Sequence, residues 1–150
     1  MPDFIIRPVV ASDWEQWLPL WTTFVGFNSV AASDGVTRTT WARFLDDNEP
    51  VHALVAERGG RLLGLAHYIF HRNTLTIAPV CYLQNLFTSE QERGQGIGRK
   101  LIEAVCAAAE QAGSPRVYWL TDEANASAMS LYDKLADRTG YVHYRRNLEQ

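Results

Sequence analysis

Apolar positions along the chain follow two different periods, and the alternation between them predicts the order of the elements. Strand-length runs rich in β-branched and aromatic residues occupy positions 4–10, 51–57, 62–70, 80–88, 116–121 and 140–148. Apolar residues at helical spacing occupy about 14–25, 39–46, 101–112 and 123–138. The expected order is β-α-α-β-β-β-α-β-α-β. This predicts an α/β fold, a central mixed β-sheet of about six strands flanked by about four helices, formed as a single domain over residues 1–150.

The second and third strand runs are joined by residues 58–61, Arg-Gly-Gly-Arg, which predicts a β-hairpin. Both runs are apolar on both faces, so we expect the sheet to be covered on both sides. Trp14, Trp17 and Trp21 fall on one face of the first helix. Such a stripe could line an aromatic binding wall, and packing of the helix on the sheet is the simpler interpretation. Residues 26–37, rich in Gly, Ser, Ala and Asn, are expected to form a mobile loop.

Composition and charge narrow the class of partner. The 150 residues are 47% hydrophobic and 21% charged, with a formal net charge of −3. This balance gives no general attraction to nucleic acid or to an anionic membrane, and it tolerates an amine substrate. Cys81 and Cys106 lie in apolar runs, which favours reduced core thiols over a disulfide or a nucleophile and predicts a cytoplasmic protein. The first residues lack the pattern of a signal peptide.

The segment 93–100 reads Arg-Gly-Gln-Gly-Ile-Gly-Arg-Lys and joins a strand run to a helical run. Glycines at alternate positions let the backbone turn tightly and lie close to a ligand. The amide N–H groups at the start of the helix, together with its dipole, favour an anion. Three cationic side chains in this segment add positive charge. We expect the turn to bind a pyrophosphate.

Two better-known phosphate loops do not fit this turn. A P-loop requires Gly-x-x-x-x-Gly-Lys-Ser/Thr, which residues 94–101 do not supply. In the dinucleotide fingerprint Gly-x-Gly-x-x-Gly the third glycine is missing, because Gly98 comes one residue early and Arg99 takes that position. That fold also places its turn after the first strand, whereas several strands precede this one. Spacing excludes both interpretations.

The spacing that fits is Arg-x-x-Gly-x-Gly, here residues 93–98, and at this motif the chain resembles the GNAT superfamily of acetyl-coenzyme A-dependent N-acetyltransferases. The preceding run, 83–88, is similar to the family's fourth strand, whose exposed backbone pairs with the pantetheine arm. Segment 125–132 with the later Gly-Tyr at 140–141 is similar to its Asn, Leu-Tyr and Gly-aromatic motif. The resemblance covers most of the chain and implies acetyl-CoA as cosubstrate, without a metal. The residues it assigns to the coenzyme are Leu86, Phe87, Thr88, Arg93, Gly94, Gln95, Gly96, Ile97, Gly98, Arg99, Asn125 and Tyr132.

Asn125 and Tyr132 carry the second motif and are seven residues apart. On one helix they share nearly the same face, about 10 Å apart along the axis, which suits two points on an extended pantetheine arm. Taken alone, Asn125 is more simply a helix cap and Tyr132 a half-buried packing residue. The resemblance implies that Tyr132 is the general acid that protonates the departing thiolate, or that it hydrogen-bonds the sulfur. A backbone N–H near Phe87 or Thr88 is the candidate oxyanion donor.

The general base is the open question of this sequence. The chain is similar to the branch of the family that acetylates histones or polyamines, in which the strand before the turn commonly carries Glu or Asp. Here that strand reads Gln84-Asn85, two amides that cannot accept a proton from an amine. The remaining base candidates are His67, His71, Tyr82 and Glu90, of which His67 is more simply a bonded core histidine. Asp34 could attract a cationic amine, and a surface charge is the simpler interpretation.

After the last helix there is room for about one strand, at 141–148, where the family commonly has two. We expect an open sheet edge carrying Arg145 and Arg146, covered by a second subunit in a homodimer. The predicted function is transfer of the acetyl group of acetyl-CoA to a primary amine, a small-molecule amine, polyamine or lysine-like group, by direct attack in a ternary complex. The alternatives are a non-catalytic acyl-CoA sensor and, more remotely, a structural domain that has lost the ligand.

Overall fold

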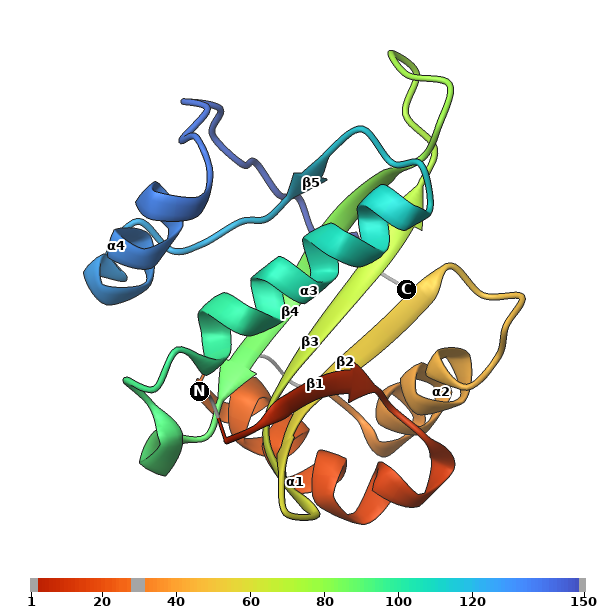
Figure 1. Cartoon of the computed structure of the whole chain (residues 1–150). Coiled ribbons are helices and arrows are strands. Elements are labelled where there is room, and N and C mark those ends of the chain that lie inside the picture. The colour runs from red at the N-terminus through yellow and green to blue at the C-terminus, as the bar shows by residue number, and fades with distance from the viewer. Residues whose placement is uncertain (1–2, 28–31, 149–150) are drawn as a thin grey trace. The chain divides into compact units, whose positions relative to one another are not determined.

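The computed structural model describes residues 3–27 and 32–148 (Figure 1). The chain separates into two compact parts, residues 1–119 and residues 120–150, each with its own internal contacts. The expectation of a single domain over the whole chain stays a prediction. The middle of the predicted 26–37 loop, residues 28–31, lies outside the described residues.

The N-terminal part contains all of the sheet. Its elements are β1 (Ile5–Pro8), η1 (Ala11–Asp13), α1 (Trp14–Phe27), α2 (Asp34–Phe44), β2 (Val51–Arg58), β3 (Arg61–His71), β4 (Val80–Thr88), η2 (Glu90–Glu92), α3 (Ile97–Gln111) and β5 (Val117–Tyr118). The predicted α/β fold and element order are confirmed up to this point, with five strands in the described sheet in place of about six. The second helix begins earlier than expected because Ser33 caps it, its Oγ accepting from the Val36 N–H at 3.1 Å.

The sheet has the simple order β1-β2-β3-β4-β5. Strands β1 to β4 pair with one another antiparallel, and β5 is parallel to β4. The predicted hairpin is confirmed, since β2 and β3 are joined by Gly59 at φ 57° and Gly60 at φ 84°. Two successive positive φ values are the backbone of a type I′ turn, which matches the twist of the strands and requires residues such as glycine.

Helices cover both faces of the sheet, as the apolar strands predicted. In Figure 1, α3 lies across the front of β3 and β4, whereas α1 and α2 lie against the other face. That second face carries the aromatic core, in which Trp17 is completely buried with ring centroids 4.8 Å from Trp41 and 5.7 Å from Trp21. The tryptophan stripe therefore packs the helix on the sheet, which confirms the simpler of its two interpretations.

The face covered by α3 depends on one close approach. A Cβ atom at Gly64 of β3 would lie 2.7 Å from the Phe87 carbonyl oxygen and 3.4 Å from a methyl of Ile97. Only glycine lets β3, β4 and the first turn of α3 come this close. The glycine turn is thus anchored directly on the strands that lead into it.

The C-terminal part contains α4 (Ala126–Leu135), shorter than the predicted 123–138. Residues 136–148 form neither helix nor strand, so the prediction of a last strand at 140–148 is wrong for the described chain. The apolar side chains of this segment are exposed: Tyr141 is 93% exposed and Val142 is 74% exposed. An alternating apolar run forms a strand only where another strand accepts its backbone hydrogen bonds.

Within residues 3–27 and 32–148, no helix combines the length and apolar character needed to cross a membrane.

Candidate functional site

The glycine turn has the backbone of an anion site. Gly94 and Gly96 both have φ 82°, in the left-handed region that favours glycine. Gly96 is also the N-cap of α3, and no side chain caps the helix there. The first amide N–H groups of a helix have no partner within it, so here they remain available to a ligand. A Cβ atom at Gly94 or Gly96 would meet no heavy atom within 4 Å, so both positions border open space. These residues fit a bound pyrophosphate.

A network of charged and amide side chains holds the turn against the β2–β3 hairpin. Arg58 donates to Glu92 Oε2 at 2.7 Å and to Gln95 Oε1 at 2.7 Å. Gln95 donates in turn to Glu92 Oε2 at 3.0 Å, and Arg61 donates to Glu92 Oε1 at 3.3 Å. The hydrogen bond from Arg58 lowers the pKa of Glu92, which therefore stays ionised at neutral pH. Gln95 was predicted to contact the coenzyme, and here both ends of its side chain serve to shape the turn.

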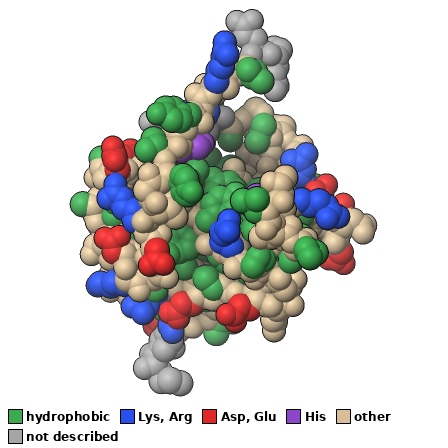
Figure 2. Space-filling model, turned by 90° about the horizontal axis from the view of Figure 1, so that it is seen from above, with side chains coloured by type: hydrophobic (Ala, Val, Ile, Leu, Met, Phe, Trp, Pro, Cys, Tyr) green, Lys and Arg blue, Asp and Glu red, His purple; other side chains and the backbone are tan. Residues whose placement is uncertain are grey.

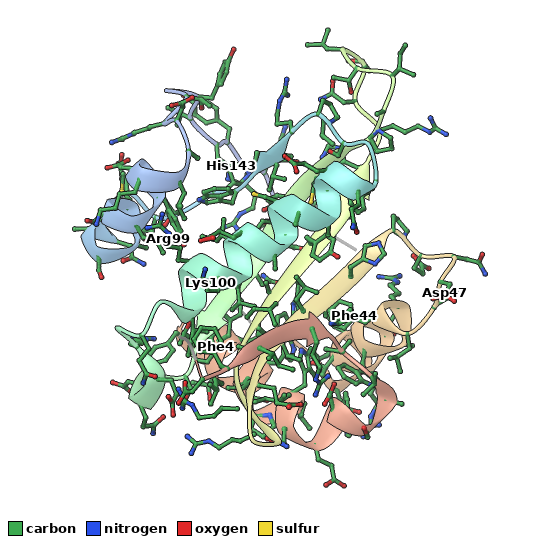
Figure 3. The ribbon with its side chains drawn as sticks, viewed as in Figure 1. Phe4, Phe44, Asp47, Arg99, Lys100 and His143 are labelled. Carbon is green, nitrogen blue, oxygen red and sulfur yellow. The ribbon has the colours of Figure 1, made fainter. Side chains whose placement is uncertain are left out.

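Cationic side chains surround the turn, as the sequence predicted. Arg93 lies 5.8 Å from the ring centroid of Phe27 and is exposed. Arg99 and Lys100 project from the beginning of α3 (Figure 3), and both pair with Glu103, at 3.3 and 3.8 Å. On the face shown in Figure 2, acidic and basic side chains are interspersed and neither sign forms a continuous patch. At the turn itself, Arg93, Arg99 and Lys100 supply positive charge, which suits an anionic group.

The strand before the turn has one open edge. The pairing of β4 with β5 is limited to Cys81↔Val117 and Tyr82↔Tyr118. From residue 83 to residue 88 no described strand pairs with this edge, whereas β3 pairs with the opposite edge as far as Thr88. The open stretch is about 17 Å long, enough for an extended arm to add backbone hydrogen bonds alongside it. Leu86, Phe87 and Thr88 lie on this stretch, as predicted.

A β-bulge lies in the same stretch. On β3 the residues His67 and Tyr68 are adjacent, but they pair with Asn85 and Leu83 of β4. Gln84 is therefore an extra residue on β4, and its side chain is exposed. The bulge falls at the two amides that occupy the expected acidic positions. Bulges redirect side chains and are frequent beside active sites.

His67 is not free to act as a base. It is 2% exposed, and the Trp17 indole N–H donates to its Nε2 at 3.0 Å. Because Nε2 accepts, the neutral ring carries its proton on Nδ1 and donates it to Asn85 Oδ1 at 3.0 Å. Burial lowers the pKa of His67 to about 4, so the ring is neutral at pH 7. His67 is a bonded core histidine, as its sequence context suggested.

His71 and Tyr82 have different surroundings from His67. The Nε2 atom of His71 lies 2.7 Å from the Tyr118 hydroxyl, and its Nδ1 atom lies 2.9 Å from the Arg72 carbonyl oxygen. The rings of Tyr82 and Tyr118 stack with centroids 4.9 Å apart. All three side chains are half-buried. They form a polar cluster where the pairing of β4 with β5 ends.

The other polar candidates are less suited to catalysis. Glu90 is exposed in η2. Asp34 pairs with Arg38 at 3.1 Å on the exposed surface of α2, which confirms the simpler interpretation of a surface charge. Cys81 and Cys106 are both free thiols, and burial raises the pKa of Cys81 to about 12. A thiol that stays protonated is a poor nucleophile.

Asn125 and Tyr132 belong to the C-terminal part. Asn125 caps α4, its Oδ1 accepting from the Ala128 N–H at 3.2 Å, which leaves its amide N–H groups for other partners. Tyr132 is half-buried, and burial raises the pKa of its phenol, so the hydroxyl keeps its proton at neutral pH and can donate it. Their assignment to the coenzyme stays a prediction.

Sequence reasoning missed two side-chain pairs of the site, because the residues of each pair are far apart along the chain. Arg58 and Glu92 are 34 residues apart, and His71 and Tyr118 are 47 apart. Neither pair forms a sequence motif, so only the register of the sheet could have revealed them. Among the described residues, no cluster of three or more His, Cys, Asp or Glu side chains could hold a metal ion.

Comparison with known proteins supports this description. Residues 13–136 match the acetyltransferase (GNAT) family. D-amino-acid N-acetyltransferase HPA3 of Saccharomyces cerevisiae is 37% identical over 145 residues, covering 95% of this chain and 90% of the yeast protein. Thialysine N-epsilon-acetyltransferase of Mus musculus is 30% identical over 112 residues, covering 66% of this chain and 65% of the mouse protein.

The solved structure of AAC(6')-Iy, an aminoglycoside N-acetyltransferase in complex with a bisubstrate analogue, has the same fold. Its TM-score is 0.84 at 19% identity, covering 98% of this chain and 99% of that chain. At this identity the likeness shows the fold alone. The glycine turn, the open edge of β4 and the match over 124 of 150 residues (13 to 136) agree with one another. The chain belongs to the GNAT family and is an acyl-CoA-dependent N-acetyltransferase.

Proposed function

We propose that this protein transfers the acetyl group of acetyl-CoA to the primary amine of a small molecule of amino-acid size, by direct attack in a ternary complex. The observation that carries the proposal is the open edge of β4 leading into an uncapped helix start at Gly96. The choice of a small acceptor is supported by the D-amino-acid N-acetyltransferase to which 95% of the chain aligns. Lysine-like and polyamine acceptors are the second choice, supported by the thialysine relative.

In this proposal the residues of the chain bind and position the reactants. The amides at the beginning of α3 and the cations Arg93 and Arg99 hold the pyrophosphate. The open edge of β4 aligns the pantetheine arm, and bound acetyl-CoA supplies the acetyl group as a thioester. A correctly held amine then reacts as if at very high local concentration, so positioning alone contributes much of the rate. The phenol of Tyr132, kept protonated by its raised pKa, is the proton donor for the leaving thiolate.

The test is release of free thiol from acetyl-CoA in the presence of an amine panel. The panel contains D-amino acids, their L enantiomers, thialysine, spermidine, a lysine peptide and an aminoglycoside. We expect the highest kcat/KM with an amino acid. A wild-type protein that is thermally stabilised by coenzyme A but releases no thiol with any amine would be an acyl-CoA sensor, and the proposal would fail.

The role of Tyr132 has its own test. Tyr132→Phe should lower kcat about 100-fold, the lower end for loss of a general acid, and change the Kd for coenzyme A by less than about threefold. Tyr144→Phe is the matched control, because Tyr144 is a 90% exposed tyrosine in the same part of the chain. Unchanged turnover in Tyr132→Phe would remove it from the mechanism.

We further propose that the protein is a homodimer. Residues 136–148 expose Tyr141, Val142, Tyr144 and Leu148 and lack backbone partners within a sheet, so a second subunit could cover them. Sedimentation at micromolar concentration should give a dimer, and a fully active monomer would contradict this. The two free thiols are consistent with a reducing compartment, and we propose a cytoplasmic location on that ground.

A further inference from the structure

The pair formed by His71 and Tyr118 has a defined direction of proton donation. A backbone carbonyl can only accept, so the 2.9 Å contact between His71 Nδ1 and the Arg72 oxygen places the imidazole proton on Nδ1. The Nε2 atom of the neutral ring is then an acceptor, and the Tyr118 hydroxyl at 2.7 Å donates to it. This leaves the lone pairs of the Tyr118 oxygen directed away from His71. The pair is therefore arranged to take up a proton at the phenol oxygen and pass another to the imidazole.

The pair lies next to the open edge of β4, along which the coenzyme arm is proposed to bind. Tyr118 is opposite Tyr82 in the last pair that β4 and β5 form, directly before the open edge at residues 83–88 begins. His71 lies four residues after His67 on β3, so both side chains point to the same face of the sheet. Asn85, beside the bulge in β4, hydrogen-bonds His67 on that face. Half-burial of His71 and Tyr118 leaves the pair within reach of a small molecule.

The surroundings of the pair keep the phenol protonated. The titratable groups facing it are Tyr82, which stacks on Tyr118, and Cys81, both on β4. Burial raises the pKa of Tyr118, and the neighbouring Tyr82 and Cys81 raise it further. The phenol therefore does not ionise on its own near neutral pH. It acts by exchanging one proton for another.

The two amides at the bulge and His67 cannot serve as the base. Gln84 and Asn85 are amides, and the oxygen of Asn85 is already held by His67. His67 has both nitrogens engaged in the core. Of the base candidates on the sheet, His71 is thus the one whose accepting nitrogen faces a hydroxyl that is itself half-exposed.

We propose that Tyr118 and His71 together form the general base of this enzyme, with Tyr118 touching the acceptor amine and His71 as the positioning residue that receives the proton. This inference rests on the proposed acetyl transfer to an amine. The ammonium of the acceptor gives one proton to the Tyr118 oxygen while the phenol's own proton moves to His71 Nε2. The freed lone pair forms the C–N bond to the acetyl carbon as the C–S bond breaks. The nitrogen loses a second proton as the departing thiolate is protonated, so the products are the amide and a free thiol. His71 then returns its proton to solvent.

The kinetic test compares basic and weakly basic acceptors. His71→Gln and Tyr118→Phe should each lower kcat with a basic amine about 100-fold, the lower end for loss of a general base, and leave the Kd for coenzyme A within about twofold. With an acceptor such as a hydrazide, which is neutral at pH 7, both variants should recover to within about fivefold of wild type, because no proton has to be removed before attack. Equal losses with both acceptors would indicate a structural role and overturn the inference.

The control variant is His52→Gln. His52 is another half-buried imidazole of the sheet, stacked on Tyr68 at 5.1 Å. It should change neither rate more than about twofold. If the wild-type enzyme turns over and both His71→Gln and Tyr118→Phe keep its rate, this inference is overturned and the proposed function stands. Absence of wild-type turnover with every amine would overturn both.

A second measurement does not depend on activity. Nitrogen NMR of the histidine rings should show His71 with its proton on Nδ1 and a hydrogen bond at Nε2 that disappears in Tyr118→Phe. A proton on Nε2 in the neutral ring, or a spectrum of His71 unaffected by Tyr118→Phe, would overturn the inference even if the variants lose activity.

Discussion

The two ends of β4 are built on opposite electrostatic principles. At its carboxyl end, Glu92 is ionised and saturated with hydrogen bonds from Arg58, Arg61 and Gln95. At its amino end lie Tyr82, Tyr118 and His71, with the Nε2 atom of His71 2.7 Å from the Tyr118 hydroxyl. The first end has fixed charges that hold a loop in one shape. The second end has groups that, in our proposal, take up a proton from the substrate and release it again to solvent.

The difference follows from what each half of the reaction requires. Binding a pyrophosphate needs donors that never change protonation, which amide N–H groups and guanidinium groups provide. Deprotonating an amine needs a group that does change protonation near neutral pH. His67 takes part in neither half of the reaction. It is a histidine, but Trp17 and Asn85 hold both of its ring nitrogens in hydrogen bonds.

The largest expected effect comes from a substitution that weakens coenzyme binding at the carboxyl end of β4 and leaves the amino end unchanged. Gly96→Val should raise the Kd for coenzyme A on the order of 100-fold. A β-branched residue cannot hold φ 82°, so the turn would change shape. Loss of two charge-assisted hydrogen bonds to the ligand, at roughly 1.5 kcal/mol each, corresponds to about that factor. Isothermal titration with coenzyme A measures it. Gly113→Val is the matched control, with φ 78° at the other end of α3, and it should bind coenzyme A normally. The ligand assignment is falsified if Gly96→Val binds as well as wild type.

A smaller effect tests whether His67 is locked as the structure shows. The folded-state pKa of about 4 lies below the ordinary value of 6.5, so between these values the unfolded chain binds more protons than the folded one. Stability is therefore lost as pH falls through this window, at about 1.4 kcal/mol per pH unit, or roughly 2 kcal/mol between pH 6.5 and pH 5. In His67→Gln that part of the pH dependence should be absent. Urea unfolding at the two pH values measures it.

The control for His67 is His143→Gln, which removes an exposed histidine and should retain the pH dependence of wild type. Lowered carboxyl pKa values, such as that of Asp13 beside Arg7, contribute in the same direction but at lower pH. Equal slopes in wild type and His67→Gln between pH 6.5 and pH 5 would mean that His67 is not held neutral.

The smallest effect concerns the shape of the glycine turn. Glu92→Gln removes the charge that Arg58 and Arg61 share, so the turn should be held less firmly. We expect the Kd for coenzyme A to rise roughly fivefold, at the low end of couplings between separate sites, with the KM of the acceptor unchanged. Glu90→Gln, an exposed neighbour in η2, is the control. A change in the acceptor KM equal to the change in Kd would contradict the separation of the two ends.

The parts of the site that were predictable are those set by neighbouring residues. The left-handed glycines at 94 and 96, the uncapped helix start and the hairpin at 58–61 follow from local backbone preferences. Asn125 as a cap follows in the same way. The helix limits were less accurate, because a cap such as Ser33 extends a helix through residues whose own preferences are weak. The predicted last strand failed because a strand needs a partner that no local pattern supplies.

The sequence by itself determined the glycine turn, the order of the elements along the chain as far as β5, and membership of an acetyl-CoA-dependent family, since each depends on short-range spacing. Tertiary structure alone decided which histidine can exchange a proton. His67 and His71 lie on the same strand, four residues apart, and nothing in their immediate neighbours separates them. The residues that separate them, Trp17 and Tyr118, are 50 and 47 positions away along the chain. A ring's protonation depends on its burial and on the partner of each nitrogen, and both are properties of the folded chain.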